Sequence, residues 1–195
     1  MLVEVKRIIL ASASPRRHEL LTAAGIDHLV RVKPIEEVRK AGEDPGTFVQ
    51  RLALEKARAA AESSDEIVLG ADTVVVVDGQ VFGKPVDDED ARRSLRTLSG
   101  RDHVVLTGIA LVFGQTSVVD ISATRVQFVS LSEDDIETYV KSGEPAGKAG
   151  AYAIQGLASR FVRRIEGCYQ NVVGLPVSLV YHHLKVLEGR KDKSG

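Results

Sequence analysis

Apolar positions along the chain alternate between strand-like and helix-like spacing, which predicts an α/β protein. β-branched runs bounded by turn residues are typical of strands, and apolar residues three and four positions apart are typical of helices. Strand-like runs cover residues 7–11, 67–77, 80–82, 103–113, 117–128, 151–154 and 161–165. Helix-like spacing covers residues 15–24, 47–62, 87–99, 132–142 and 177–187. Because some strands stand alone between helices and others form hairpins, we expect a mixed twisted sheet with flanking helices.

Turn and capping residues mark several of these boundaries. Asp78-Gly79 is a typical two-residue hairpin turn between the second and third strands. Thr47 with Gln50, and Ser132 with Asp135, have the spacing of capping boxes. The sequence therefore predicts helix starts at Thr47 and Ser132.

The helix after the first strand begins with an unusual charge. Ser14 and Pro15 suit its start, so Arg16 and Arg17 fall at the positive end of the helix dipole. The helix at 87–99 opens instead with four acidic residues and carries its arginines later, as the dipole favours. The inversion predicts a bound anion such as phosphate, helped by the Ser12 and Ser14 hydroxyls. The alternative is a solvated arginine pair on a surface helix.

Asp72 lies inside the apolar strand at 67–77. A buried carboxylate needs a compensating partner, which here is a metal ion, a nearby lysine or a water that it deprotonates. We expect Gly70 and Ala71 to leave space for a ligand to approach. The alternative is an edge-strand Asp72 that points to solvent.

Two lysines are candidates for the same cleft. Lys56 falls in the middle of a helical stripe formed by apolar residues, namely Phe48, Val49, Leu52, Ala59 and Ala60. Either its ammonium enters a cleft or its stem packs on the stripe while the charge stays in water. Lys84 follows the hairpin and is expected to reach the cleft of Asp72, with an ordinary loop lysine as the alternative.

Glu37 and Gln155 complete the candidates from the residues alone. Glu36 and Glu37 are able to bind a divalent metal, with a solvated charge cluster as the alternative. Gln155 ends a strand-like segment with an amide that donates and accepts, which matches the imide edge of uracil or thymine. A structural amide is the alternative for Gln155.

Composition restricts the class of ligand that the chain is expected to bind. The chain has 195 residues, 44% hydrophobic residues, a formal net charge of −1 and 5% aromatic residues, which favours a small anionic ligand over nucleic acid. Cys168 is the one cysteine, no apolar run has membrane-spanning length, and no signal-peptide pattern is seen, so we expect a cytoplasmic protein without a membrane partner. We expect one domain over residues 1–189, possessing two lobes, and a flexible charged tail over 190–195.

Nine short motifs occur in an order and spacing that resemble the Maf family of nucleoside triphosphate pyrophosphatases, from Ile8 to about Leu187. They occupy residues 10–17, 55–57, 70–73, 83–85, 98–100, 143–145, 149–152, 154–156 and 171–176. The resemblance implies two lobes around a deep cleft in a Maf/ITPase-like fold. It also implies hydrolysis between the α and β phosphates with Mg²⁺ or Mn²⁺ as cofactor, and a homodimer.

The resemblance further assigns roles by position. Asp72 would be the general base and, with Glu37, a metal-linked carboxylate. The substrate-binding set would be Ser12, Arg16, Arg17, Lys56, Thr73, Lys84 and Gln155. Within this set, Arg16, Thr73 and Gln155 would govern base choice, and Ser12, Arg16, Lys56 and Lys84 would bind phosphate.

The segment Tyr152-Ala153-Ile154-Gln155-Gly156 is similar to the branch of the family that acts on dTTP and UTP. Ala153 replaces a usual glycine, and Gly147 precedes Lys148 where an aspartate is usual. The expected function is house-cleaning hydrolysis of dTTP and UTP, and also of modified pyrimidine nucleotides. The alternatives are the same chemistry on 7-methyl-GTP or ITP, and a non-catalytic nucleotide sensor that inhibits septum formation.

Overall fold

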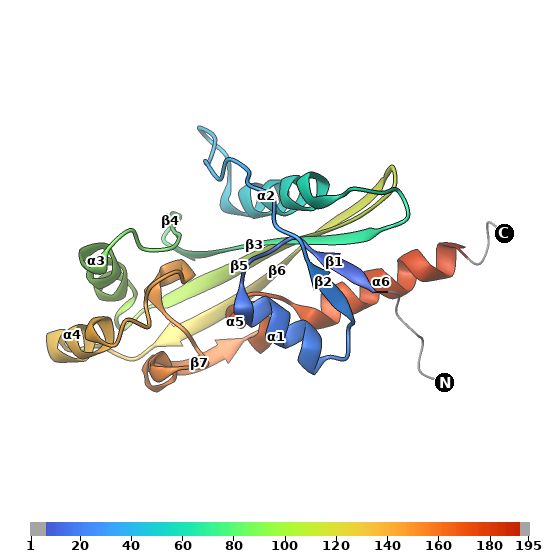
Figure 1. Cartoon of the computed structure of the whole chain (residues 1–195). Helices are drawn as coiled ribbons and strands as arrows, with labels where there is room; N and C mark the ends of the chain where they lie inside the picture. The colour runs from blue at the N-terminus through green and yellow to red at the C-terminus, as the bar shows by residue number, and fades with distance from the viewer. Residues whose placement is uncertain (1–6, 192–195) are drawn as a thin grey trace. The chain divides into compact units, whose positions relative to one another are not determined.

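The chain folds into two compact units. The computed structural model describes residues 7–191, with side chains to residue 187 (Figure 1). Unit 1 comprises the described parts of Met1–Asp72, Thr107–Ser122 and Gly174–Gly195, and unit 2 comprises Thr73–Leu106 and Ala123–Val173. The expected single domain over 1–189 and the deep cleft both remain predictions. Of the predicted tail, 190 and 191 lie in the last helix, and 192–195 lie outside the described residues.

The strands pair in a mixed sheet, as predicted. Among the described residues the order is β2-β1-β3-β5-β6-β7, with β4 paired to β3. Strand β1 pairs in parallel with β2 and β3, whereas the pairs β3/β4 and β6/β7 are antiparallel. The bounds are β1 Ile8–Leu10, β2 His28–Val30, β3 Ile67–Val77, β4 Gln80–Phe82, β5 Asp102–Phe113, β6 Thr116–Phe128 and β7 Val162–Glu166.

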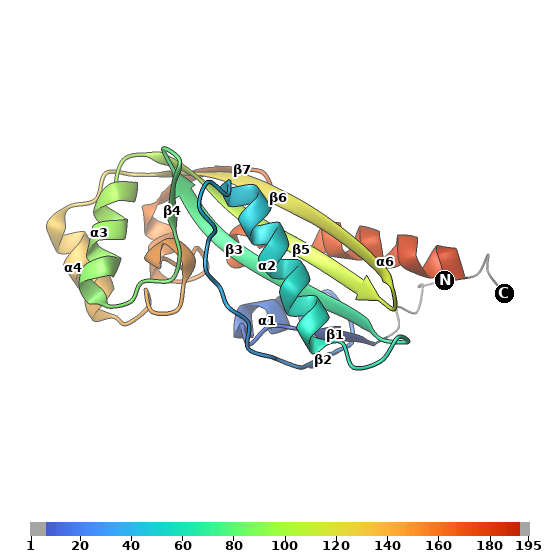
Figure 2. The ribbon, with the colours of Figure 1, turned by 90° about the horizontal axis from the view of Figure 1, so that it is seen from above.

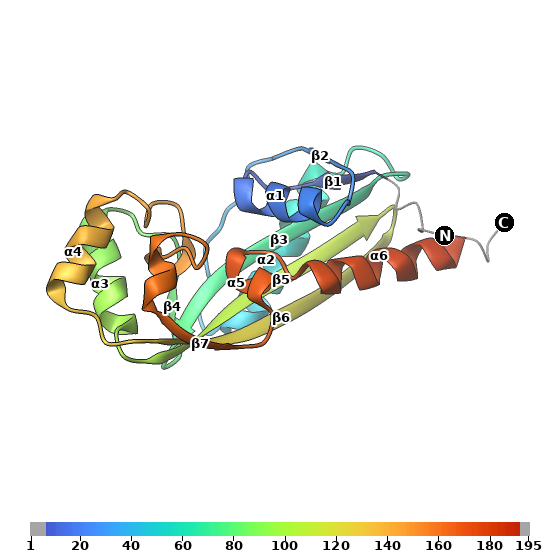
Figure 3. The ribbon, with the colours of Figure 1, turned by 90° about the horizontal axis from the view of Figure 1, so that it is seen from below.

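In unit 1, helices cover both faces of the sheet (Figures 1 and 3). Ile8 and Leu10 pack in one cluster with Leu21 of α1 (Pro15–Ala23) and Val180 of α6 (Val177–Lys191). Ile9 points the other way, toward Ala53 and Ala57 of α2 (Pro45–Ala60). Successive strand residues face opposite sides, so coverage of both faces explains the nearly continuous apolar strand sequences.

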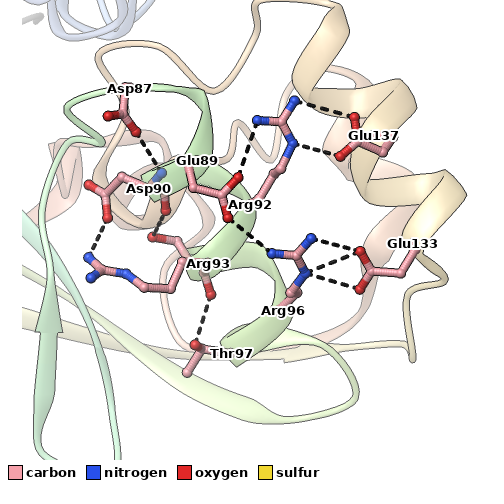
Figure 4. Close-up of polar contacts among 10 residues, drawn as sticks. Asp87, Glu89, Asp90, Arg92, Arg93, Arg96, Thr97, Glu133 and Glu137 are labelled. Atoms are coloured by element: carbon pink, nitrogen blue, oxygen red, sulfur yellow. Dashed lines mark hydrogen bonds and ion pairs between the residues drawn. The ribbon is translucent and has the colours of Figure 1, made fainter.

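In unit 2, helices α3 (Asp88–Leu98) and α4 (Glu133–Lys141) pack side by side (Figure 2). Ion pairs join them on the exposed side: Arg92 Nε lies 2.6 Å from Glu137 Oε1, and Arg96 Nη2 lies 2.8 Å from Glu133 Oε2 (Figure 4). Glu89 contacts both arginines from within α3. Because exposed ion pairs stabilise little, the burial of apolar side chains such as Leu95 of α3 and Ile136 of α4 contributes more to the stability of unit 2.

Short-range signals predicted the hairpin, α3 and α4 correctly, but the start of α2 was wrong. The Ser132–Asp135 capping box is present. Helix α2 begins at Pro45, because Asp44 Oδ1 accepts hydrogen bonds from the backbone N–H groups of Gly46 and Thr47, each at 3.0 Å. Within α2 the predicted stripe also changes, since Ala59 is exposed while Ala53 and Ala57 are buried.

The strand predicted at 151–154 is wrong. Residues Ala149–Ala151 form a 3₁₀ turn, η1, in which Gly150 and Ala151 have φ values of 67° and 60°. A Cβ atom on Gly150 would lie 2.6 Å from Val75 Cγ2, so this turn packs closely on β3. Sequence patterns also missed β2, the 3₁₀ turn η2 (Leu157–Phe161) and the short helix α5 (Tyr169–Val173).

No helix within residues 7–191 combines the length and apolar character needed to cross a membrane.

His103 of β5 gives unit 2 a pH-dependent stability. It is 2% exposed, its Nε2 lies 2.8 Å from Tyr152 Oη, and burial lowers its pKa from 6.5 to about 4. The unfolded chain therefore binds the proton first as the pH falls. We expect the free energy of unfolding to drop by about 3 kcal/mol between pH 6.5 and pH 4, and to level off below that range.

Denaturant titrations of the wild type and His103→Gln across this range test the prediction. His103→Gln should flatten the pH dependence, whereas His182→Gln, at an exposed position on α6, should keep it. An equally steep loss of stability in His103→Gln would show that other groups are responsible.

Candidate active site

Two glycines allow helix α2 to lie directly against the sheet. A Cβ atom on Gly70 of β3 would lie 2.0 Å from the carbonyl oxygen of Ala53, and one on Gly108 of β5 would lie 2.4 Å from that of Val49. Any larger residue would force the helix away from the strands. The expectation that Gly70 and Ala71 leave room for a ligand was wrong, because the α2 backbone fills the space at Gly70 and Ala71 is fully buried.

This close packing brings Lys56 of α2 against Asp72 of β3. Lys56 Nζ lies 2.6 Å from Asp72 Oδ1, and each side chain is 11% exposed. Asp72 therefore does not point to solvent, and of the partners predicted for it the structure provides the lysine. The same Nζ lies 2.9 Å from Oε1 of Glu37, whose side chain is 47% exposed. Two carboxylates thus meet at one ammonium group.

Arg17 braces three segments beside this pair. Its Nε donates to the carbonyl oxygen of Gly174 at 2.8 Å, and its Nη1 donates to Ser12 Oγ and to the carbonyl oxygen of Ala71, each at 2.9 Å. Burial lowers the pKa of Arg17, and the negative charges of Asp72 and Glu37 act in the opposite direction. Arg17 therefore links the start of α1 to the residue that precedes Asp72.

Ser12, Ser14 and Arg16 lie at the start of α1. Ser12 is 8% exposed, and its Oγ also accepts the backbone N–H of Ser14 at 3.3 Å. Ser14 is the N-cap residue, but its side chain makes no capping hydrogen bond. Arg16 is half-buried in the first helical turn, and its positive charge acts to lower the pKa of Arg17. Of the two arginines at the start of α1, Arg17 is therefore a buried structural residue, and Arg16 is the more accessible cation.

The cluster in unit 1 carries an excess of positive charge. Its cations are Arg16, Arg17 and Lys56, and its carboxylates are Asp72 and Glu37. A polyanion such as a triphosphate suits this balance.

The remaining predicted site residues belong to unit 2. Thr73 follows Asp72 in β3 and is half-buried, whereas Lys84 after β4 and Gln155 between η1 and η2 are exposed. Their approach to the Asp72 cluster remains a prediction.

The two carboxylates of this cluster suit a cation whose remaining ligands come from a substrate and from water. Residues 7–191 hold no group of three or more His, Cys, Asp or Glu side chains arranged for a metal ion. Asp72 and Glu37 nevertheless converge on one positive charge, that of Lys56. Mg²⁺ commonly takes one or two carboxylates and completes its shell with phosphate oxygens and water, so these two residues suit such an ion.

Some features of the site were not visible in the sequence. Nothing distinguished the braced Arg17 from Arg16, because Gly174 and Ala71 are distant in the chain. In the sequence, Gly174 is recognisable only as part of the motif at 171–176, yet its carbonyl oxygen accepts a hydrogen bond from Arg17.

The fold has a counterpart among solved structures. The Ham1 protein of Staphylococcus aureus aligns with 95% of this chain and 100% of its own, with a TM-score of 0.54 and 15% sequence identity. This likeness concerns the fold alone.

Sequence comparison gives the family. The model for the family described as Maf-like protein matches residues 7–187. The dTTP/UTP pyrophosphatase of Koribacter versatilis (strain Ellin345) is 49% identical over 179 residues, which cover 91% of this chain and 93% of that protein. The dTTP/UTP pyrophosphatase of Symbiobacterium thermophilum is 51% identical over 174 residues, with 89% and 90% covered. The chain belongs to the Maf family.

The adjacent arginines should respond differently to the same substitution. Arg17→Lys removes the planar fork that reaches three oxygens, so we expect the free energy of unfolding to fall by about 2–4 kcal/mol. Arg16→Lys should leave stability nearly unchanged, because Arg16 is half-buried rather than buried. Denaturant titration of both variants measures the difference. A fully stable Arg17→Lys protein would contradict the bracing role.

Proposed function

We propose that this chain hydrolyses dTTP and UTP to the nucleoside monophosphate and pyrophosphate, as a house-cleaning enzyme. The observation that carries the proposal is the contact of Lys56 with the buried Asp72 inside a cluster of net positive charge. It is supported by relatives about half identical to this chain that are named dTTP/UTP pyrophosphatases.

In the proposed reaction, water attacks the α-phosphorus and pyrophosphate leaves. Asp72 accepts the proton of that water on its carboxylate, and Lys56 fixes the orientation of the carboxylate through the contact at 2.6 Å. The phosphates are bound by Ser12, Arg16, Lys56 and Lys84. The positive charges among these residues stabilise the negative charge that develops on the leaving pyrophosphate. Arg17, which the resemblance places among substrate ligands, acts here by holding Ser12 and Ala71 in place.

Asp72 and Glu37 would hold a divalent cation, Mg²⁺ or Mn²⁺. When bound, the cation offsets phosphate charge that the side chains leave uncompensated.

Base choice is proposed for Arg16, Thr73 and Gln155. The side-chain amide of Gln155 both donates and accepts, so it complements the adjacent carbonyl and N–H of uracil or thymine. A base that presents two donors at this edge would leave one polar group unpaired, which costs binding free energy. Ala153 and Gly147, the two departures from the family pattern, lie in the same part of unit 2.

The substrate also sets where the protein works. We propose a cytoplasmic enzyme that acts on free nucleotides and needs neither nucleic acid nor a membrane as partner. The homodimer that the resemblance implies remains a prediction, to be measured by analytical ultracentrifugation.

Asp72→Asn should abolish turnover while it preserves nucleotide binding. The amide keeps the size of the side chain but cannot accept the proton, so kcat should fall by a factor of about 10² or more. Pyrophosphate release from dTTP with Mg²⁺ or Mn²⁺ measures kcat, and calorimetry measures binding. Near-normal turnover in Asp72→Asn would remove Asp72 from the role of general base.

The same assay across dTTP, UTP, CTP, GTP, ITP and 7-methyl-GTP tests the substrate. Preference for dTTP and UTP, lost in Asp72→Asn, supports the proposal. Preference for another base would keep the reaction and discard the assignment of Gln155. Tight binding without pyrophosphate release from any nucleotide would favour a nucleotide sensor instead.

A further inference from the structure

We infer that Glu144 is a positioning residue for nucleobase selection, because its carboxylate sets the turn that presents Gln155. This inference rests on the proposed function, in which Gln155 contacts the pyrimidine. Glu144 follows α4, and Gln155 lies between η1 and η2, so the two are separated in the chain but belong to the same unit.

The Glu144 carboxylate binds the backbone directly after Gln155. Its Oε2 accepts the N–H of Leu157 at 2.9 Å, and its Oε1 accepts the N–H of Ala158 at 3.4 Å. These two amides open the 3₁₀ turn η2, whose first N–H groups have no partner within the turn. Glu144 therefore caps η2 from outside and fixes where the turn begins.

Tyr139 extends the same hold to the backbone before Gln155. Its hydroxyl donates to Glu144 Oε1 at 2.8 Å and accepts the N–H of Ala153 at 3.1 Å. Tyr139 is fully buried, and burial together with the contact to Glu144 raises its pKa, so the hydroxyl stays protonated and available as a donor. One carboxylate thus restrains the chain on both sides of Gln155.

Gly156 is required by this arrangement. A Cβ atom at residue 156 would lie 2.2 Å from Glu144 Oε2, so the carboxylate occupies the place of a side chain. The backbone there has a φ of −105°, outside the left-handed region that favours glycine, so the contact with Glu144 is the main reason for a glycine at this position. The two motifs at 143–145 and 154–156 are therefore parts of one device.

The chemistry calls for a carboxylate and not an amide. The carboxylate of Glu144 accepts hydrogen bonds from the hydroxyl of Tyr139 and from the N–H groups of Leu157 and Ala158, so each of these partners is a donor. Partial burial acts to raise the pKa of Glu144, but these hydrogen bonds outweigh it and the pKa lies below its usual value. A glutamine would set its NH₂ group against one of the donors.

Tyr152 fixes the beginning of the same segment. Its hydroxyl lies 2.8 Å from Nε2 of the buried His103, so the chain enters this turn from an anchored position. Gln155 itself is exposed, which suits a side chain that meets a ligand while its neighbours are held.

The test compares the wild type, Glu144→Gln, Glu144→Asp and Gly156→Ala. Steady-state pyrophosphate release is measured with dTTP and with GTP, whose base presents two donors, and amide hydrogen exchange is followed for residues 152–160. Glu144→Gln and Gly156→Ala should lower kcat/KM for dTTP by about tenfold, mainly through KM, with little effect on GTP. Exchange at 153–158 should become about tenfold faster. Glu144→Asp keeps the charge and should recover part of both effects.

Two further variants give the controls. In Glu137→Gln an ion pair with Arg92 is lost on the exposed side of unit 2, so selectivity should not change. In the double variant Glu144→Gln/Gly156→Ala the two effects should not add, because both remove the same contact.

The outcomes separate the two claims. Faster exchange at 153–158 with an unchanged dTTP-to-GTP ratio of kcat/KM would overturn the inference and leave the proposed function intact. Unchanged exchange in both single variants would likewise overturn it. A wild type without pyrimidine preference would overturn the proposed function and, with it, the role of Glu144 in base selection.

Discussion

The contact between Lys56 and Asp72 is the interaction on which the site depends. A carboxylate inside an apolar strand is costly without a cation, and Lys56 supplies that cation at 2.6 Å. The lysine reaches Asp72 because the α2 backbone lies against β3 and β5 where Gly70 and Gly108 lack side chains. The close packing of α2 on the sheet therefore also places the positive charge that Asp72 requires.

Arg17 solves a second problem at the same place. The segments after β1 and before α6 must both be held near Asp72, and the guanidinium joins them through Ser12, Ala71 and Gly174. With Arg17 engaged in this way, Arg16 and Lys56 are the unit 1 cations that we propose as phosphate ligands. A buried carboxylate would weaken a pure triphosphate binder, so its presence among these cations favours an enzyme.

Local sequence signals predicted much of the fold. Three of these signals depend only on residues close together in the sequence, so tertiary packing does not alter them. They are the Asp78-Gly79 turn, the acidic start of α3 and the capping box of α4. The start of α2 was missed because Thr47 with Gln50 resembles a capping box, although Asp44-Pro45 just before it is the stronger start. The strand at 151–154 failed because the positive φ values at Gly150 and Ala151 accompany close packing on Val75.

The pairing of Lys56 with Asp72 was foreseeable from the sequence, whereas the roles of the site residues toward a substrate remain predictions. The isolated carboxylate at Asp72 and the lysine in the apolar stripe of α2 both pointed to a shared cluster. The purpose of Gly70, the difference between Arg16 and Arg17, and the use of Glu144 each depend on a partner far along the chain. No spacing rule covers such partners, because tertiary packing alone brings them together.

A crystal structure with α,β-methylene-dTTP and Mg²⁺ tests the central claim most directly, since this analogue cannot be cleaved between the α and β phosphates. The account predicts the α-phosphate beside Asp72, with Arg16 and Lys56 on the phosphates and the thymine ring at Gln155. A triphosphate bound away from Asp72 and Lys56 would contradict it.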